Sequence, residues 1–346
     1  MQFPKNIFSG YHGQIHCQGI AVDAKKGYIY YSFTTKLIKA DLLGNVIGSV
    51  DGLIGHLGCI DFCEQDGKVY GSLEYKNDII GKIILKSLHM ADVEIKNAFY
   101  CVIFDVDKID RMNMNAETDG IMRAVYLPQV AEDFEACVTV KGARLPHKYA
   151  CSGIDGIGWG PAWGQSAGRE YLRICYGVYG DVDRCDNDYQ VILTFDAARW
   201  WDTVARPLRQ GEMHRCGDGS ASKCFVCTGS TTFGVQNLEY DAYKKQWMLA
   251  VYRGKKPGLP NYDMFFISAD AMPRPAVHTV YGEEISELPL SRRGIYFPYG
   301  ATGMYAFGDG RYYFSRAGQH EQLGQYTNAV LYRATSEDEA PFAEVT

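Results

Sequence analysis

Five times along the chain, a group of short strand-like segments recurs, and this repetition constrains the fold more than any other feature of the sequence. The segments are runs of Val, Ile, Tyr and Phe bounded by Gly, Asn or Asp, the pattern typical of β-strands between turns. In the first group, residues 18–23 and 28–33 flank a turn that ends at Gly27. Each group contains four such segments, which predicts five consecutive four-stranded antiparallel units. The units cover residues 11–52, 53–130, 147–230, 231–284 and 296–346.

These units predict an all-β fold, most simply a β-propeller of five four-stranded antiparallel blades, because radial repetition leaves only short sheet edges. With 346 residues, of which 47% are hydrophobic, the chain can bury a large core and is not intrinsically disordered. No linker-like segment divides the chain, so we expect a single domain over residues 1–346. A pair of β-sandwiches built from the same strands is the alternative.

One segment departs from the strand pattern and predicts a short helical insertion at about residues 78–90, between the second and third strands of the second unit. Asn77 is a suitable capping residue. Ile80, Ile84 and Leu88 recur at the i, i+4, i+8 spacing of one helix face. We expect this apolar stripe to pack on the propeller rim; a groove for a partner is the alternative.

The charge and hydropathy of the chain argue against two classes of partner. Its 35 basic and 41 acidic residues give a net charge of −6 with no long run of either sign, so nucleic acid is not expected as a partner. The longest apolar runs are far shorter than the ~18 residues of a membrane-spanning helix, so no membrane is expected either. The first residues lack the apolar core of a signal peptide, which predicts a cytoplasmic protein if Met1 is the natural start.

The eleven cysteines lie mostly within strand-like segments, and we expect buried thiols rather than a disulfide framework. His214, Cys216, Cys224 and Cys227 superficially offer four zinc ligands. However, Cys224 and Cys227 fall in a predicted strand, where positions i and i+3 face opposite sides of the sheet. Buried or surface thiols are therefore the preferred interpretation.

The connections between strands predict which face of the propeller carries function. In an antiparallel unit, the connections between second and third strands share one face with the connections between units. These connections are long and rich in charged and aromatic residues, at 73–78, 177–189, 253–262 and 315–322. Functional residues tend to lie on loops held by a rigid scaffold, so we predict a site on this face. The alternative is that these loops are simply solvated.

Two histidines occupy matching positions in the first two units. His16 and His56 each stand four residues before an Ile and eleven residues before the turn Gly. Both would begin the first strand of a unit and could point into the central channel, with Asp155 and Gln236 at nearby positions of later units. Two His and a carboxylate or amide can hold a divalent metal in the channel. Hydrogen bonding to a substrate and a purely structural role are the alternatives.

Carboxylates and cations on the same face predict the chemistry. Glycoside hydrolysis uses two carboxyl groups about 5–10 Å apart, one protonated and one ionised. Glu74, Asp181 and Asp183 are the catalytic candidates, as acid or base. Arginine can hold an anionic group, and tyrosine can stack on a sugar face; ordinary pairing with neighbouring acids is the alternative. The substrate-binding candidates, besides His16, His56, Asp155 and Gln236, are Tyr179, Arg253, Lys255, Tyr262, Arg316 and His320.

The blade repeats resemble those of the β-propeller superfamily, and no more specific family is matched. Five-bladed propellers include glycosidases of the arabinanase and levansucrase type, and also lectins. This resemblance implies carbohydrate chemistry at the top of the central channel, but it transfers no catalytic residues, because His16 stands where those hydrolases place an Asp. We therefore expect a glycoside hydrolase or lyase acting on an anionic sugar or oligosaccharide. The alternative is a non-catalytic sugar- or protein-binding propeller.

Overall fold

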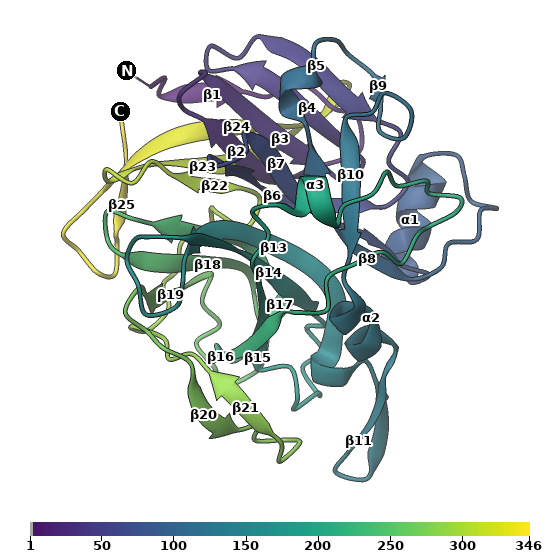
Figure 1. Cartoon of the computed structure of the whole chain (residues 1–346). Helices are drawn as coiled ribbons and strands as arrows, with labels where there is room; N and C mark the ends of the chain where they lie inside the picture. The colour runs from purple at the N-terminus through teal and green to yellow at the C-terminus, as the bar shows by residue number, and fades with distance from the viewer. Residues whose placement is uncertain (1–2) are drawn as a thin grey trace.

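Five sheets are arranged radially in the computed structural model, which describes residues 3–346 (Figure 1). The chain is therefore a five-bladed β-propeller, and the fold class predicted from the repeats is confirmed. Each blade presents its first strand at the centre, so that β2, β6, β13, β17 and β22 surround the central channel. The alternative of two β-sandwiches is wrong, because the main strands of each sheet come from one repeat and the sheets are arranged around a central channel.

The first three blades have the four consecutive strands that the sequence predicts. A short strand, β9 (Met114–Asn115), adds in parallel to the outer edge of blade one. The strands are, in blade one, β2 (Cys17–Asp23), β3 (Tyr28–Phe33), β4 (Lys36–Asp41) and β5 (Val46–Asp51); in blade two, β6 (His56–Cys63), β7 (Lys68–Tyr75), β8 (Ala98–Phe104) and β10 (Met122–Tyr126); and in blade three, β13 (Cys151–Pro161), β14 (Glu170–Val178), β15 (Tyr189–Phe195) and β16 (Ser222–Cys227).

Blade four has three strands, β17 (Thr231–Asp241), β18 (Gln246–Arg253) and β19 (Met264–Ser268). The sequence predicts a fourth strand at residues 277–281, and this is wrong. Instead, β20 (Arg274–Val277) and β21 (Glu284–Glu287) pair with each other as a hairpin. The hairpin joins the outer edge of blade three, where β21 runs parallel to β16.

Blade five joins the two ends of the chain. It contains β22 (Met304–Ala306), β23 (Arg311–His320) and β24 (Gly324–Ala334). The outer edge of β24 pairs with β25 (Phe342–Glu344), as the sequence predicts, and also with β1 (Asn6–Phe8), which the sequence does not predict. The N-terminal strand thus closes the ring by completing the last blade.

The helical insertion lies where the sequence predicts it, as α1 (Ile79–Ser87). Its capping residue is Asp78, whose side chain accepts a hydrogen bond of 2.9 Å from the backbone N–H of Gly81, and the prediction of Asn77 as the cap is wrong. A short helix, α3 (Trp200–Thr203), follows the third strand of blade three, where the sequence predicts a helix-prone turn at residues 195–202. Other insertions have no counterpart among the predicted elements: the helix α2 (Pro128–Glu135) and the exposed ribbon of β11 (Cys137–Val140) and β12 (Ala143–Pro146). No helix within residues 3–346 has the length and apolar character to cross a bilayer.

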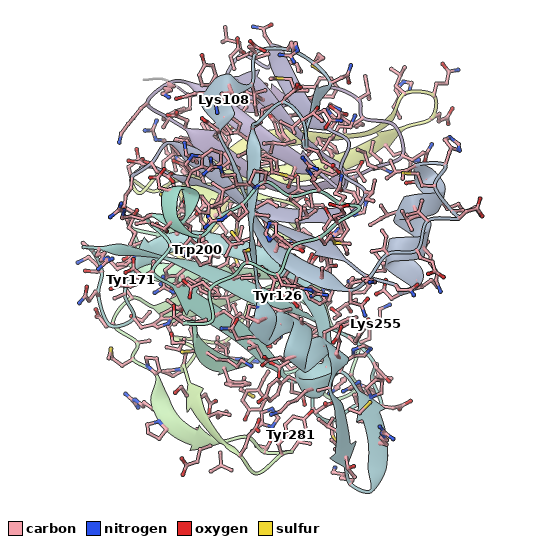
Figure 2. All side chains as sticks on the ribbon, turned by 45° about the vertical axis from the view of Figure 1, so that its right-hand side comes forward. Lys108, Tyr126, Tyr171, Trp200, Lys255 and Tyr281 are labelled. Atoms are coloured by element: carbon pink, nitrogen blue, oxygen red, sulfur yellow. The ribbon has the colours of Figure 1, made fainter. Side chains whose placement is uncertain are left out.

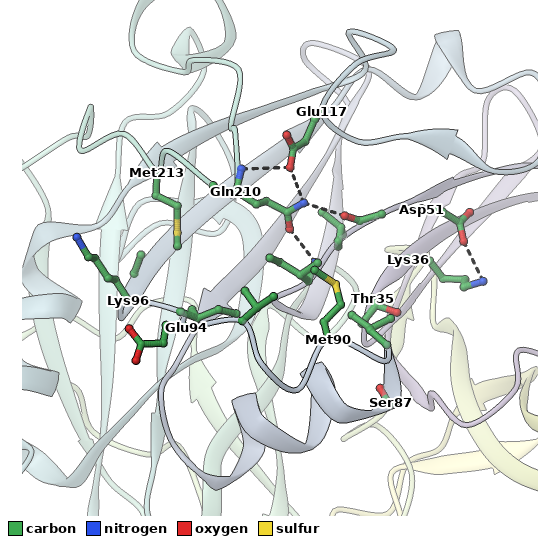
Figure 3. A pocket seen from close by; sticks show the side chains of 18 of the residues that line it. Thr35, Lys36, Asp51, Ser87, Met90, Glu94, Lys96, Glu117, Gln210 and Met213 are labelled. Atoms are coloured by element: carbon green, nitrogen blue, oxygen red, sulfur yellow. Dashed lines mark hydrogen bonds and ion pairs between the residues drawn. The ribbon is translucent and has the colours of Figure 1, made fainter.

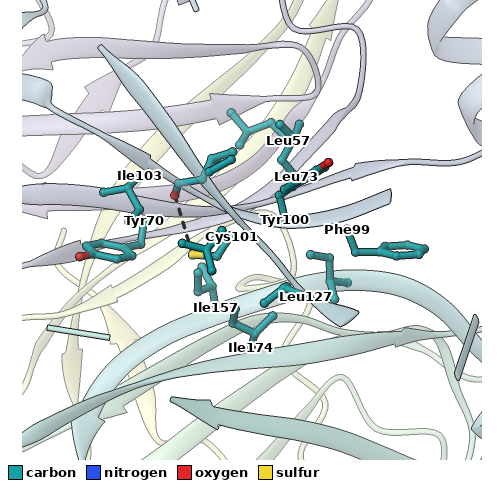
Figure 4. Packing of buried hydrophobic residues seen from close by; sticks show 14 of the residues in the cluster. Leu57, Tyr70, Leu73, Phe99, Tyr100, Cys101, Ile103, Leu127, Ile157 and Ile174 are labelled. Atoms are coloured by element: carbon teal, nitrogen blue, oxygen red, sulfur yellow. Dashed lines mark hydrogen bonds between the residues drawn. The ribbon is translucent and has the colours of Figure 1, made fainter. Parts of the chain in front are cut away.

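The largest buried cluster lies between blades two and three, where Tyr70, Leu73 and Cys101 face Ile157 and Ile174 (Figure 4). The inner strands approach closely because glycines on one strand face the backbone of the next inner strand. A side chain on Gly19 would meet the backbone N of Ile60 at 2.8 Å, and one on Gly158 would meet the Leu238 carbonyl at 2.5 Å. Such contacts leave no room for a ligand between these parts of the inner strands. Space for a ligand is therefore expected at the ends of the channel.

All eleven cysteines are free, as the sequence predicts. Seven of them are buried, whereas Cys137, Cys216 and Cys227 are exposed and Cys185 is partly exposed. Over residues 3–346, no three side chains of His, Cys, Asp or Glu come together as a metal site. His214, Cys216, Cys224 and Cys227 therefore do not form a zinc site in this structure.

Candidate functional site

A cavity of about 470 Å³ lies where the inner strands begin, at the mouth of the central channel. We call it the mouth pocket. Its floor and walls come from blades one to four, and α1 forms a roof with Ile80, Ile83 and Ile84. Side chains that carry hydrogen-bonding or acid–base groups into the pocket are Gln14, His16, Gln18, Thr34, His56, Glu74, Lys76, Ser87, Ser152, Asp155, Gln236 and Tyr252.

Strand pairing explains how the centre of the pocket is assembled. His56 begins β6 and stands opposite Glu74 near the end of β7, so the β6–β7 register places the two side by side. Asp155 comes from β13 of the next blade, at an irregularity in its pairing with β14. The Nδ1 atom of His56 lies 3.6 Å from Oε1 of Glu74 and 3.7 Å from Oδ1 of Asp155. One imidazole therefore stands between two carboxyl groups.

Glu74 is held rigidly by groups of blades two and three. Its Oε1 pairs with the ammonium group of Lys76 at 2.5 Å, and its Oε2 accepts a hydrogen bond of 2.9 Å from the backbone N–H of Ile154. Lys76 also donates to the Ser152 carbonyl at 2.7 Å. Gly153 has a φ of +118°, and a Cβ there would lie only 1.8 Å from Oε2 of Glu74. The approach of Glu74 to β13 therefore requires glycine at position 153.

The environments of the two carboxyl groups differ. Burial raises the pKa of Glu74, but the neighbouring Lys76 charge and hydrogen bond act in the opposite direction. Burial raises the pKa of Asp155 well above its usual range, and the charge of Glu74 raises it further. Lys76 keeps a raised pKa in spite of its burial, because Glu74 and Asp78 stabilise its charge. Burial thus raises the pKa of both carboxyl groups, but Glu74 alone is ion-paired with Lys76, so a proton shared by the site resides preferentially on Asp155.

His56 is neutral in this environment. Burial and the nearby charge of Lys76 lower its pKa to about 3. Its Nδ1 and the Oδ1 of Asp155 are buried, and neither has a hydrogen-bond partner. Buried polar atoms without partners are rare in folded proteins, and they mark places where a ligand or water completes the structure.

Amide side chains position the rest of the polar groups. Gln236 donates to Oδ2 of Asp155 at 3.1 Å, and Gln18 lies 2.9 Å from Nε2 of His16. His16 stands at the outer edge of the pocket, and desolvation of its ring lowers its pKa. His16, His56, Glu74, Asp155 and Gln236, all proposed from the sequence, therefore share one pocket.

The donor set of the pocket does not form a metal site. His16 already contacts Gln18, and both oxygen atoms of Glu74 accept hydrogen bonds within the protein. Within residues 3–346, no three side chains of His, Cys, Asp or Glu gather here as a metal site. The Nδ1 atom of His56 is left without a hydrogen-bond partner.

The other catalytic candidates lie outside the mouth pocket. Asp181 and Asp183 are exposed on the β14–β15 connection, where a carboxylate oxygen of Asp181 accepts a hydrogen bond of 2.9 Å from the backbone N–H of Asp183. Tyr179 is closer to the site, because its hydroxyl lies 3.3 Å from a carboxylate oxygen of Asp78, the residue that caps α1. It does not line the pocket.

The predicted anion-binding arginines are neutralised within the protein. Arg253 forms a two-pronged ion pair with Asp263 at 3.0 and 2.6 Å, and Arg316 bonds to Glu344 and to the hydroxyl of Tyr332. Neither arginine lines the mouth pocket. Three further candidates also lie outside it, namely Lys255 (Figure 2), Tyr262 and His320.

Several polar residues of the pocket are not predicted from the sequence, among them Lys76, Gln18, Ser152 and Tyr252. Lys76 was detectable, because it stands two residues after Glu74 at the end of a strand, and residues i and i+2 face the same side. Ser152 and Tyr252 carry no comparable signal. They reach the pocket only through the packing of blades three and four against blade two.

No family model matches the sequence, and no curated protein matches it. Three of the solved structures with a similar fold illustrate the range of proteins that share it. They are the arabinanase of Bacillus subtilis (8% identity, 94% of this chain and 97% of that chain, TM-score 0.38), the calcium-binding protein regucalcin of Agrobacterium tumefaciens (13%, 94% and 94%, 0.36) and a gluconolactonase of Xanthomonas campestris (9%, 92% and 88%, 0.33). At these identities and TM-scores the likenesses carry no argument about function.

Proposed function

We propose that this protein is a carbohydrate-active enzyme, a glycoside hydrolase or lyase, that acts on a sugar in the mouth pocket. One observation supports the proposal most strongly. Two buried carboxyl groups, Glu74 and Asp155, stand on either side of His56, and the ammonium group of Lys76 counteracts the rise in pKa more strongly at Glu74 than at Asp155. Pairs of titratable groups whose environments separate their pKa values are the usual acid and base of an active site.

The distances to His56 set an upper bound on the spacing of the carboxyl groups, and this bound falls within the range that glycosidases use. Both lie within 3.7 Å of one nitrogen atom of His56, so the two oxygen atoms are separated by no more than twice that distance. Glycosidases place their carboxyl groups about 5–10 Å apart. In hydrolysis, Asp155 donates its proton to the departing glycosidic oxygen, and Glu74 accepts a proton from the water that attacks the sugar.

A neutral sugar fits the charge of the pocket better than an anionic one. Lys76 is its one ammonium or guanidinium group, and Lys76 is already paired with Glu74. The amides Gln18 and Gln236 can bind hydroxyl groups, and Phe233 offers an aromatic face. A lyase needs a uronate substrate whose carboxylate is neutralised, which makes hydrolysis the better supported reaction. A uronate substrate remains the prediction from the sequence, and the assay below includes it.

The experiment is a turnover screen with neutral and uronate oligosaccharides, measuring release of reducing ends and formation of unsaturated products. Asp155→Asn should lower kcat at least ~100-fold, because the proton donor is lost. Asp270→Asn, an exposed aspartate outside the pocket, is the matched control. If Asp183→Asn abolishes turnover while Asp155→Asn does not, the active site lies on the β14–β15 connection instead.

A non-catalytic sugar-binding propeller is the second candidate. One observation favours it, because both oxygens of Glu74 already accept hydrogen bonds from the protein. In that case sugars bind the wild-type protein, the binding depends on Gln236 and Asp155, and no product forms with any substrate in the screen.

A further inference from the structure

A second and larger cavity opens on the same end of the propeller, on the other side of α1. We call it the side cleft. Its volume is about 1200 Å³ (Figure 3). Its walls are formed by the segment before β2, the connection between blades one and two, the chain that follows α1, and the loop at residues 210–215. A cavity that holds one small molecule has a volume of about 300–1,000 Å³, so the side cleft exceeds what a single sugar unit needs.

The side cleft and the mouth pocket adjoin each other. Gln14, Ile15 and Ser87 line both cavities. Ser87 is the last residue of α1, so the C-terminal end of the helix marks the passage between them. Beneath the helix, a small void touches residues of both cavities, with Ile54 on the side-cleft face and His56 on the pocket face. A ligand seated at Asp155 can therefore continue past Ser87 into the side cleft.

The walls of the side cleft are fixed by a buried amide. The oxygen of Gln210 accepts hydrogen bonds from the Ile54 backbone N–H at 2.7 Å and from the Tyr75 hydroxyl at 2.9 Å. Its nitrogen donates to the Gly52 carbonyl at 2.7 Å and to Glu117 at 2.8 Å (Figure 3). Because these bonds join the 210–215 loop to blades one and two, the cleft is already formed without a ligand.

The lining of the side cleft does not suit a polyanion. It contains three cationic side chains and four carboxylates, and one cation, Lys36, is paired with Asp51 at 2.9 Å. Among these groups stand apolar surfaces of Leu88, Met90 and Met213. Alternating hydrogen-bonding and apolar surface is complementary to a chain of neutral sugars, whose units present hydroxyl groups at their edges and carbon–hydrogen faces between them.

We propose that the side cleft binds the further units of a neutral oligosaccharide whose reacting unit occupies the mouth pocket. The proposal rests on the function proposed above and names its substrate class: an extended neutral glycan rather than a single sugar or a polyuronate. Chain length, and not only the identity of the reacting unit, then sets the affinity.

The test is calorimetric binding of oligosaccharides, from disaccharide to hexasaccharide, derived from arabinan, glucan and galacturonan, to the full-length protein. We expect a neutral hexasaccharide to bind at least ~10-fold more tightly than its disaccharide. Met213→Arg and Gly211→Arg each place a bulky side chain in the side cleft. In both variants the gain with length should fall below ~3-fold while disaccharide affinity is unchanged. Met272→Arg, an exposed methionine outside both cavities, is the matched control.

Affinity that is independent of length, a gain that persists in both cleft variants, or a preference for galacturonan would each overturn the proposal. The outcome for the proposed function is separate. Turnover of short substrates without a gain in affinity with length retains the enzyme and rejects the side cleft as a glycan site. A cleft-dependent gain without turnover retains the cleft and rejects the enzyme. If no oligosaccharide binds, both proposals are wrong.

Discussion

At the scale of single residues, the buried Lys76–Glu74 pair is the feature on which the site depends. Lys76 and Glu74 are 6% and 3% exposed, so each charge relies on the other rather than on water. Removing one partner of a buried pair leaves the other charge uncompensated, which is far more damaging than replacing both.

Lys76→Met should therefore lower the free energy of unfolding by about 3–5 kcal/mol at neutral pH. Loss of the ammonium raises the pKa of Glu74 further, so the folded variant keeps this carboxyl group protonated. The free-energy cost of taking up that proton on folding becomes smaller as the pH is lowered. The loss of stability should thus shrink as the pH falls from neutral toward the usual range for glutamate. Urea denaturation at several pH values measures this, with the exposed Lys255→Met as control. A loss of stability that is the same at every pH would contradict the assignment.

Gly153 provides a second prediction at this scale. Gly153→Ala places a Cβ against Oε2 of Glu74 and forces an unfavourable φ, so we expect a loss of about 2–4 kcal/mol. Gly67 also has a positive φ, of +69°, but nothing lies within 4 Å of a Cβ there. Gly67→Ala should therefore cost only about 1–2 kcal/mol. Thermal denaturation compares the two variants, and equal losses would show that contact with Glu74 is unimportant.

Most residues of the site that the sequence predicts lie on or beside inner strands, whose repeat positions can be aligned between blades. His56, Asp155 and Gln236 belong to inner strands, His16 directly precedes one, and Glu74 stands opposite His56 on the next strand. Asp181 and Arg253 are predicted from reactive connections, and the path of a connection is set by contacts with other blades. The connection that follows Arg253 brings Asp263 to this arginine, and the two side chains pair outside the channel. The position of a residue within a repeat can thus be inferred from the neighbouring sequence. The direction of a long loop cannot, because it depends on contacts with distant residues.

At the scale of elements, α1 forms the roof of the mouth pocket and the boundary with the side cleft. The sequence predicts its position but not its function, because periodicity shows which face is apolar and not what that face covers. Ile84 is buried, Ile80 is half-buried, and Ile83 lines the pocket although 61% exposed. The apolar surface that the sequence assigns to the rim therefore also roofs a cavity.

The N-terminal end of α1 gives a prediction that separates two adjacent residues. Asp78→Ala should lower the local stability of α1 by about 1 kcal/mol, because the side chain caps the helix at Gly81. Asn77 makes no such contact, as its backbone N–H bonds to Asn97 instead. Asn77→Ala should leave the helix unchanged. Hydrogen exchange of residues 79–87 measures both effects. A larger loss of protection in Asn77→Ala than in Asp78→Ala would identify Asn77 as the capping residue instead.

At the scale of the whole molecule, the ring is held closed by a three-residue strand. Ile7 of β1 is 1% exposed, and its carbonyl accepts a hydrogen bond of 3.2 Å from the hydroxyl of Tyr31 in blade one. The repeat count predicts the five blades, because each blade is built from neighbouring segments. It does not predict this closure, because β1 is too short to show a strand pattern and pairs with residues more than 300 positions away.

Ile7→Ala should destabilise the whole propeller by about 2–4 kcal/mol, since a buried aliphatic side chain is lost at the joint. Asn6→Ala, at an exposed position of the same strand, should change stability by less than ~0.5 kcal/mol. Denaturation followed by both tryptophan fluorescence and circular dichroism measures the effect. If unfolding of the Ile7→Ala variant leaves the signal of the other blades unchanged, the closure is local and the ring does not unfold as one unit.

The same closure determines the order in which the protein can be assembled during synthesis. The ribosome makes β1 more than 300 residues before its partner β24, which begins at Gly324. While the residues between them are made, β1 must wait without its native neighbour as four blades form behind it. The ring can therefore close only after β24 has left the ribosome. A nascent chain stalled before residue 324 would contain blades one to four, with β1 still lacking its partner strand β24.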